Sequence, residues 1–215
     1  ALMLLILRQL MHWREQRKLL QDRAEKERIR AQYEILKSQI SPHFLFNAFN
    51  TLSQLIEMDP PKAGKYVDQL AELFRKVLHF RDQQVIALSE EMALVNAYVH
   101  LQQQRFENRF QVTVNLPAAC ETMLVIPMSV QLLIENAVKH NVITSAHPLQ
   151  IDVYVEGQRL VVRNRLQPKK SSEPSTGYGL SSLQTRYAQD FNQTIEVTRT
   201  QAYFIVSIPL LNPQS

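Results

Sequence analysis

The chain has little cysteine and little glycine, and it lacks a long uninterrupted apolar run. Its one cysteine, Cys120, excludes an internal disulfide and a metal cluster built on several thiolates. Only four of the 215 residues are glycine, so a place where two of them fall close together is informative. The apolar run at residues 1–7 is interrupted by Arg8, whereas a helix that spans a bilayer needs about 20 apolar residues. This run also lacks the basic start and cleavage site of a secretory signal peptide.

Basic residues are concentrated near the N-terminus, although the net charge of the whole chain is only +4. An abruptly apolar start followed by a basic run is typical of the cytoplasmic end of a membrane span that begins further upstream. An amphipathic helix that docks on its own protein is the alternative. A basic arm for nucleic acid is a further interpretation, but acidic residues alternate with the basic ones, as on a solvated helix face. We therefore expect membrane attachment through residues before this chain, and no nucleic-acid partner.

Helical periodicity extends through the first eighty residues. Residues 19–40 contain no proline or glycine, and their apolar positions fall on one seam, which favours a coiled coil or a long bundle helix. Ser41 and Pro42 predict a new helix, with serine as the N-cap and proline at the first helical position. A turn at residues 59–61 and a second helix at 63–80 complete a helical hairpin. A lone hairpin cannot bury both faces, so we expect two copies to pair as a dimeric four-helix bundle.

The period of the pattern changes after a third helix, which is expected at about 89–106. Apolar residues then alternate or form short runs that predict strands at 110–116, 151–155, 160–162, 195–197 and 204–208. Helices are expected between these strands at about 128–141 and 180–190. The C-terminal part is therefore predicted to be an α/β sandwich, a mixed sheet covered on one side by helices.

The whole chain is accordingly an α+β protein with three parts. We assign residues 1–40 to a membrane-proximal helix, 41–84 to the helical hairpin, and 85–215 to the sandwich. The boundary between hairpin and sandwich is expected near residues 83–88.

A polar face on the helix expected at 128–141 is the first candidate site. Glu135 and Lys139 are four residues apart, as are Asn136 and His140, so each pair shares a face. The amide oxygen of Asn136 is a suitable ligand for Mg²⁺, which in proteins usually also binds substrate phosphates. A neighbouring carboxylate can accept a proton or orient a nucleophile. An ordinary surface helix with a polar face would show the same spacing.

Two of the four glycines, Gly177 and Gly179, directly precede the helix expected at 180–190. Glycines before a helix let backbone N–H groups approach a phosphate, and the helix N-terminus adds positive potential. A loop that meets a helix also uses glycine for purely structural reasons. Three cations fit either a phosphate site or a solvated surface: Lys169, Lys170 and Arg186.

His43 is a candidate nucleophile, because it lies beside Pro42 at the head of an apolar helix. A neutral imidazole is a competent phosphoryl acceptor. Asn47 lies one turn later on the same face, where its amide could orient the ring or a water. The alternative is that His43 is a packing residue, as most histidines beside phenylalanine and leucine are.

Together these residues resemble the sensor histidine kinases of the LytS-like group. The phospho-acceptor segment of that family has the pattern Pro-His-Phe-Leu-Phe-Asn, which is present here at residues 42–47. The similarity covers most of the chain from about Leu36 onward. It includes the segments 88–91, 98, 104–106, 126–127, 135–140 and 177–186.

The resemblance implies a dimeric phospho-acceptor domain joined to a GHKL-type ATP-binding sandwich, with residues 1–40 as a signalling helix. Such a protein is an ATP-dependent histidine kinase of a two-component system, at the cytoplasmic face of a bacterial inner or plasma membrane. It transfers a phosphoryl group from Mg-ATP to its own histidine, and then to an aspartate in the receiver domain of a response regulator. His43 would be this histidine, and the segment at 83–88 would act as a hinge.

The same resemblance implies roles for the other candidate residues. Asn136 would hold Mg²⁺, and Glu135 would act as a base or orienting group. The remaining residues would line the nucleotide or flank its phosphates: Lys139, His140, Asn141, Gly177, Gly179, Leu180 and Arg186.

One position departs from the family pattern. Kinases with this sandwich commonly carry Asp-x-Gly after the strand expected at 160–162, where the aspartate accepts from the adenine amine. This chain has Asn164 and Leu166 instead. Asn164 can still accept through its carbonyl oxygen, but it offers no carboxylate. A degenerate kinase that acts as a non-catalytic dimeric signalling module is therefore the alternative to an active enzyme.

Overall fold

The structure, a computed structural model, describes residues 42–80, 82–169 and 178–213. The chain forms two compact units, residues 1–53 and 54–215, which are described one at a time. Residues 1–40, Ser41, Lys170 and Gly177 lie outside the described residues, as do the expectations that rest on them.

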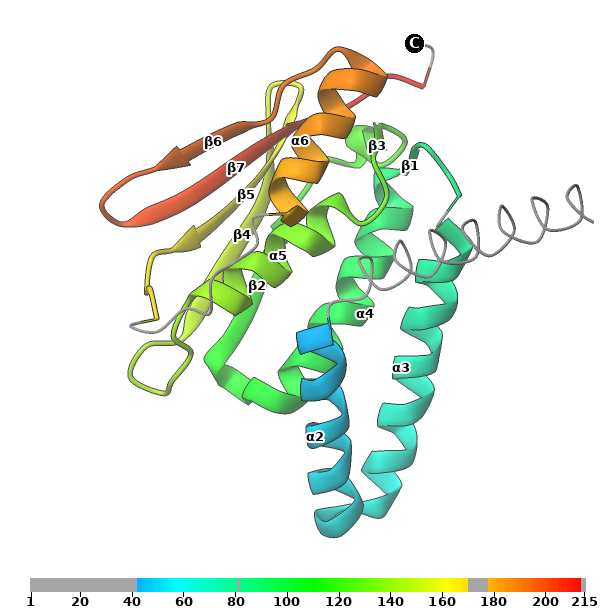
Figure 1. The fold of residues 1–215 in the computed structure, drawn as a ribbon, viewed down its shortest axis with the longest axis vertical. Coiled ribbons are helices and arrows are strands. Elements are labelled where there is room, and N and C mark those ends of the chain that lie inside the picture. Colours follow the sequence, from blue (N-terminus) through cyan, green and yellow to red (C-terminus); the bar gives the residue numbers. More distant parts are fainter. Residues whose placement is uncertain (1–41, 81, 170–177, 214–215) are drawn as a thin grey trace, which may run out of the picture. The chain divides into compact units, whose positions relative to one another are not determined.

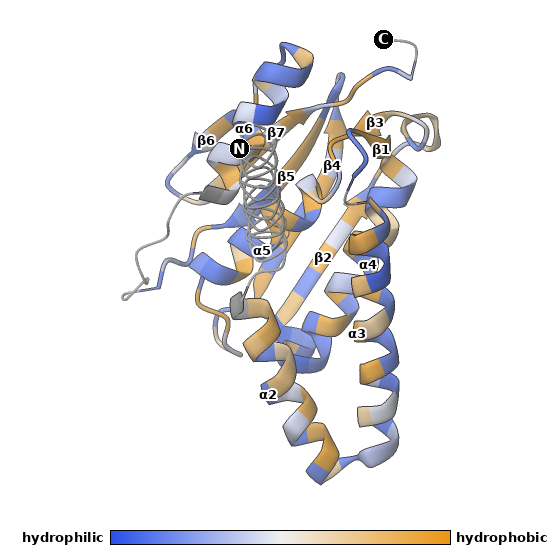
Figure 2. Ribbon diagram, turned by 45° about the vertical axis from the view of Figure 1, so that its right-hand side comes forward, coloured by the Kyte–Doolittle hydropathy of each residue, from blue (hydrophilic) through white to orange (hydrophobic). Residues whose placement is uncertain are grey.

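In the first unit, the described residues form the N-terminal part of helix α2 (Pro42–Met58). Pro42 is the first residue of this helix in the described chain, consistent with its fixed φ and missing N–H. His43 therefore lies in the first turn and Asn47 one turn later, and the Thr51 hydroxyl donates to the Asn47 carbonyl at 2.9 Å. Hydrophobic and hydrophilic positions alternate along α2 (Figure 2).

The second unit begins with the last turn of α2 and helix α3 (Pro60–Phe80). Asp59 caps α3, because its carboxylate accepts the N–H of Lys62 at 3.1 Å. The helix thus begins three residues before the predicted start at 63. Its buried residues recur at three- and four-residue steps, as predicted: Ala63, Tyr66, Leu70, Leu73, Val77 and Phe80.

Helix α4 (Leu88–Phe106) packs against both α3 and the later helix α5 (Ser129–His140). It begins one residue before the predicted Ser89, because Ala87 is the N-cap and its N–H donates to the Glu90 carboxylate at 3.0 Å. Ala87 also belongs to β1 (Ile86–Ala87), which pairs antiparallel with β3 (Leu124–Val125). The sequence analysis missed this small sheet, because strands of two residues show no alternation.

The main sheet has five strands in the order β2-β4-β5-β7-β6. Their bounds are β2 (Phe110–Asn115), β4 (Leu149–Glu156), β5 (Arg159–Arg165), β6 (Glu196–Arg199) and β7 (Tyr203–Pro209). β2 and β4 are parallel and the other neighbours are antiparallel, so the sheet is mixed, as predicted. The helices α4, α5 and α6 (Tyr178–Phe191) lie over one face of this sheet (Figure 1). Two short 3₁₀ helices, η1 (Glu107–Arg109) and η2 (Ala118–Cys120), flank β2.

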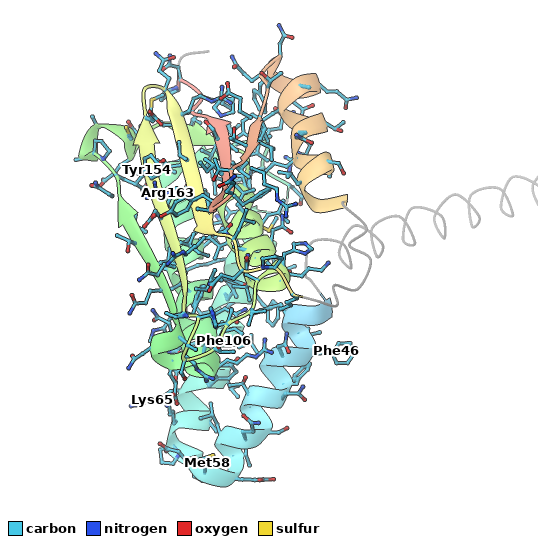
Figure 3. All side chains as sticks on the ribbon, turned by 90° about the vertical axis from the view of Figure 1, so that its left-hand side faces the viewer. Phe46, Met58, Lys65, Phe106, Tyr154 and Arg163 are labelled. Carbon is cyan, nitrogen blue, oxygen red and sulfur yellow. The ribbon has the colours of Figure 1, made fainter. Side chains whose placement is uncertain are left out.

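The two faces of the sheet differ, as β5 shows. Its side chains alternate between faces, so Arg163 and Asn164 point in opposite directions. Arg163 lies on the open face, where it donates to Asp152 at 2.8 Å and stacks over the rings of Tyr154 and Tyr203 (Figure 3). Asn164 is buried under the helices, with 4% of its surface exposed. The helix-covered face is therefore the one that can contribute to a site near α5.

The fold class predicted from the sequence, helices followed by an α/β sandwich, is confirmed. Pairing of two hairpins into a bundle stays a prediction. Among the described residues, no helix combines the length and the hydropathy that a membrane crossing requires.

Candidate functional site

Helix α5 begins at an end that is sealed by a side chain from α4. The carboxylate of Glu91 accepts the backbone N–H groups of Met128 at 2.7 Å, Val130 at 2.8 Å and Gln131 at 3.3 Å. These are N–H groups that a helix start leaves without intrahelical partners. Glu91 is fully buried. Burial raises the pKa of Glu91 to about 7, although the three backbone hydrogen bonds favour the ionised form.

One polar stripe of α5 faces the start of α6. Leu132, Asn136 and His140 recur at four-residue steps and so share a face. Gly179, in the first turn of α6, approaches Leu132 so closely that an added Cβ would lie 2.8 Å from its Cδ1 atom. Asn136 is therefore one turn beyond the contact between α5 and α6, and it is half-buried. The structure thus brings Leu132 against the helix start that contains Gly179, with Asn136 and His140 one and two turns further along the same face of α5.

On a second stripe, which also carries Lys139, Glu135 lies within electrostatic reach of Tyr98 on α4. Burial and, secondly, the charge of Glu135 raise the pKa of Tyr98 well above its ordinary value. The Tyr98 hydroxyl accepts a hydrogen bond from Gln102 Nε2 at 2.9 Å, and both side chains are buried. Glu135 therefore lies beside a neutral, fixed hydroxyl group of α4.

The C-terminal end of α5 is tied to the segment that follows β5. Asn141 is buried, donates from Nδ2 to the carbonyl of Ala137 at 2.8 Å, and accepts the N–H of Gln167 at 2.7 Å. Lys169 donates from its backbone to His140 at 3.2 Å and from Nζ to the carbonyl of Lys139 at 2.8 Å. Asn141 thus has a structural role, and its contact with a nucleotide stays a prediction.

Four cationic or basic side chains gather at this end: Arg105 from α4, Lys139 and His140 from α5, and Lys169. We call them the basic cluster. Burial lowers the pKa of Arg105, and burial with the charge of Arg105 lowers the pKa of Lys169. The pKa of His140 is lowered by burial and by the charges of Lys139 and Lys169. In residues 42–80, 82–169 and 178–213, none of the ion pairs includes a member of this cluster. The cluster therefore has the electrostatics of an anion-binding site.

Two further predicted site residues, Asn164 and Arg186, lie on β5 and α6. Asn164 donates from Nδ2 to the carbonyl of Arg165 at 2.8 Å, so its carbonyl oxygen is the atom suited to accept from a ligand. Arg186 is half-buried on α6 and its charge acts on the neighbouring Tyr187. His43 and Asn47 belong to the first unit, so their relation to the residues of α5 stays a prediction.

Sequence reasoning missed the roles of Glu91 and Arg105. In the sequence, Glu91 and Arg105 carried only the family resemblance. Both lie within the matching segments 88–91 and 104–106, which was the only available signal. Their roles depend on which helices pack together, and local sequence does not encode that.

The residues present fit magnesium and a polyphosphate. Within the described ranges, no three His, Cys, Asp or Glu side chains come together as a metal site. Mg²⁺ does not require one, because it is usually held by one or two protein oxygens, substrate phosphates and waters. The half-buried amide of Asn136, one turn before His140 of the basic cluster, would supply such an oxygen.

Comparisons of the sequence with known proteins find histidine kinases and LytS sensor proteins. The profile of the family described as "Histidine kinase" matches residues 31–110. Sensor protein LytS of Enterococcus faecalis (strain ATCC 700802 / V583) is 38% identical over 174 residues, which cover 74% of this chain and 30% of that protein. Sensor histidine kinase/phosphatase LytS of Staphylococcus aureus (strain MRSA252) is 32% identical over 173 residues, 73% of this chain and 30% of that protein. The chain thus spans about 30% of the length of these relatives.

A solved structure, the cytoplasmic segment of histidine kinase QseC, is 20% identical and has a TM-score of 0.43. The match covers 71% of this chain and 94% of that one.

Proposed function

Because the chain belongs to the LytS-like sensor histidine kinases, we propose that it is the catalytic part of an ATP-dependent autokinase. His43 accepts the γ-phosphoryl group of Mg-ATP and then passes it to an aspartate on the receiver domain of a response regulator. The observation that carries this proposal is the basic cluster, half-buried and without ion pairs in the described chain, beside the amide of Asn136.

Four residues of α5 have roles in this proposal. The amide oxygen of Asn136 binds Mg²⁺, while Lys139 and His140 bind phosphate oxygens. Glu135 orients the attacking group or accepts its proton. Phosphoryl transfer depends mainly on positioning and charge neutralisation, and a cluster of cations on a rigid helix supplies both.

The nucleotide is bounded by residues from two further elements. Gly179 and Leu180, at the start of α6, lie beside the phosphates together with Gly177, and Arg186 adds positive charge further along α6. Asn164 accepts from the adenine amine in place of the usual aspartate, and Asn141 lines the same pocket.

The phospho-acceptor half acts as a homodimer. Four exposed apolar side chains on α2 support pairing with a second copy: Phe46, Phe49, Ile56 and Met58. His43 and Asn47 are on this hairpin (residues 41–84), and a hinge at 83–88 allows the sandwich (residues 85–215) to deliver its nucleotide. Residues upstream of the chain attach the protein to the cytoplasmic face of the bacterial membrane.

The direct test is phosphorylation of the purified protein with Mg²⁺ and ATP labelled at the γ-phosphate. The expected product carries an acid-labile, base-stable phosphate, as a phosphohistidine does. His43→Gln should remove the label, whereas His147→Gln, a change at an exposed loop histidine, should leave it intact. Equal labelling of His43→Gln and wild type would show that the phospho-acceptor is another residue.

A second candidate, a non-catalytic dimeric signalling module, is favoured by Asn164 and Leu166. Calorimetry distinguishes the two, because a module of this kind would bind neither ATP nor ADP. If the wild type binds weakly, Asn164→Asp should strengthen the binding by restoring a carboxylate acceptor. If neither the wild type nor Asn164→Asp binds nucleotide, the module is favoured.

A further inference from the structure

Among the residues that the structure describes, Glu91 is the one fully buried carboxylate, and the proposed mechanism leaves it unused. Its side chain is on α4, but all three of its recorded hydrogen bonds go to the first turn of α5. One oxygen accepts the N–H of Met128 and the other accepts those of Val130 and Gln131. The start of α5 is therefore held by a neighbouring helix instead of a residue of its own chain segment.

The geometry at this start explains why a cap from outside is needed. Met128, at the N-cap position, has a φ of 63° and supplies no side-chain oxygen. A non-glycine residue in this region is strained, so surrounding contacts must hold it. The hydrogen bond from its N–H to Glu91, at 2.7 Å, is the shortest of the three.

A second contact with α4 lies further along α5. Glu91 and Tyr98 are seven residues apart on α4, and Met128 and Glu135 are seven apart on α5, a rise of about 10 Å along each helix. Both helices lead away from the capped end, and Glu135 is close enough to Tyr98 to influence its ionisation. The cap therefore determines which part of α4 lies opposite Glu135.

We propose that Glu91 is a positioning residue: by capping α5 from α4, it fixes the register in which α5 presents Glu135 and Asn136 to the nucleotide. This inference rests on the proposed function. A change at Glu91 would allow the start of α5 to shift or fray, and that movement would be transmitted to residues one and two turns later.

Protonation of Glu91 gives a way to separate positioning from stability. Burial raises the pKa of Glu91 from an ordinary 4.5 to about 7. No charged side chain of the described chain contributes to this shift, and the titratable group that faces Glu91 is Tyr187 of α6. Burial also raises the pKa of Tyr187 to about 12, so that its hydroxyl stays neutral.

The contribution of Glu91 to stability and its positioning of α5 depend on pH in opposite directions. The folded protein binds the Glu91 proton more tightly than the unfolded chain does, so this contribution to stability is complete below pH 4.5 and is lost as the pH rises through 7. The ionised carboxylate, however, is the better acceptor for three N–H groups. Positioning should therefore be strongest above the pKa, where the contribution to stability is smallest.

Glu91→Gln imitates the protonated form, because an amide has one acceptor oxygen and places N–H donors where the second oxygen was. At about pH 8, we expect Glu91→Gln to bind Mg-ADP roughly tenfold more weakly than wild type. Amide hydrogen exchange at residues 128–131 should become faster. Near pH 6 the affinities should converge, because wild-type Glu91 is then largely protonated. Comparison at each pH cancels the ionisation of the nucleotide itself.

The matched control is Glu90→Gln, which changes the neighbouring carboxylate that caps α4 itself. It should leave exchange at residues 128–131 and the pH dependence of Mg-ADP binding unchanged. A Glu91→Gln protein with wild-type exchange and affinity at about pH 8 would overturn the inference. So would a deficit in affinity that follows the loss of thermal stability at every pH.

If Glu91→Gln does not fold, the wild type provides the test. The amide resonances of Val130 and Gln131 should titrate with a midpoint near 7 in the wild type and in Glu90→Gln, and invariant resonances would contradict the inference. If the wild type binds no Mg-ADP at all, the proposed function fails, while exchange and titration still decide whether Glu91 holds α5.

Discussion

The two ends of α5 differ in how their charges are satisfied. At the N-terminal end, three backbone N–H groups meet one fully buried carboxylate, Glu91. At the C-terminal end, the basic cluster has no ion-pair partner in the described chain. The N-terminal end is therefore satisfied within the described chain, whereas the C-terminal end carries positive charges that have no ion-pair partner there. Under the proposed function, Glu91 holds one end of this helix and the nucleotide binds at the other.

The connections around the C-terminal end refine this comparison. Asn141 and Lys169 satisfy the backbone there, through Ala137, Gln167 and the last carbonyl groups of α5. The backbone groups at this end thus have hydrogen-bond partners, whereas the positive charges of the basic cluster have no ion-pair partner in the described chain. This difference predicts which substitutions affect ligand binding and which affect stability.

The largest effect is expected from Asn136→Ala, which removes the proposed Mg²⁺ ligand from the middle of α5. The rate of autophosphorylation should fall by about 100-fold, with little change in the midpoint of thermal unfolding, because Asn136 is only half-buried. Labelling with ATP and thermal scans measure the two quantities. Asn96→Ala, at an exposed position of α4, is the control, and equal rates for both variants would remove Asn136 from the site.

Asn141→Ala should act on stability instead. It leaves the carbonyl of Ala137 and the N–H of Gln167 without their side-chain partner in a buried place, so the free energy of unfolding should fall by about 2 kcal/mol. Chemical denaturation measures this loss, with the exposed Asn108→Ala as the control. A stable Asn141→Ala protein that has lost nucleotide binding would instead support the predicted contact with the nucleotide.

Lys169→Met should weaken nucleotide binding by about tenfold, since it removes one charge of the basic cluster and the Nζ bond to the carbonyl of Lys139. Calorimetry with Mg-ADP at two salt concentrations tests this, because the loss should be smaller at high salt. Lys65→Met, on the exposed side of α3 (Figure 3), should bind as the wild type does. A loss that is independent of salt would mean that Lys169 acts only as a helix cap.

The smallest effect is expected from Tyr98→Phe. It removes the hydroxyl that accepts from Gln102, so stability should fall by about 1 kcal/mol. Chemical denaturation measures this loss. An unchanged free energy of unfolding in Tyr98→Phe would show that this hydrogen bond adds nothing to stability.

The sequence predicted the elements well because their signals are local. Pro42 and the helical periodicity predicted α2, and alternation or short apolar runs predicted the five strands of the main sheet. The errors were at helix starts, where Asp59 and Ala87 are the caps, and at β1 and β3, which are too short to carry a period. Site residues on one helix, such as Asn136 and His140, could likewise be grouped by spacing alone.

Composition, periodicity and the segments at 42–47 and 135–140 were sufficient to determine the fold class and the family of this protein. Local sequence specifies backbone conformation and which residues share a helix face. Only the tertiary structure decided that Glu91 caps a different helix, that Asn141 ties α5 to Gln167, and that Arg105 and Lys169 join Lys139 and His140. The physical reason is that burial, desolvation and hydrogen bonding between segments distant in sequence depend on packing, which exists only once the chain has folded.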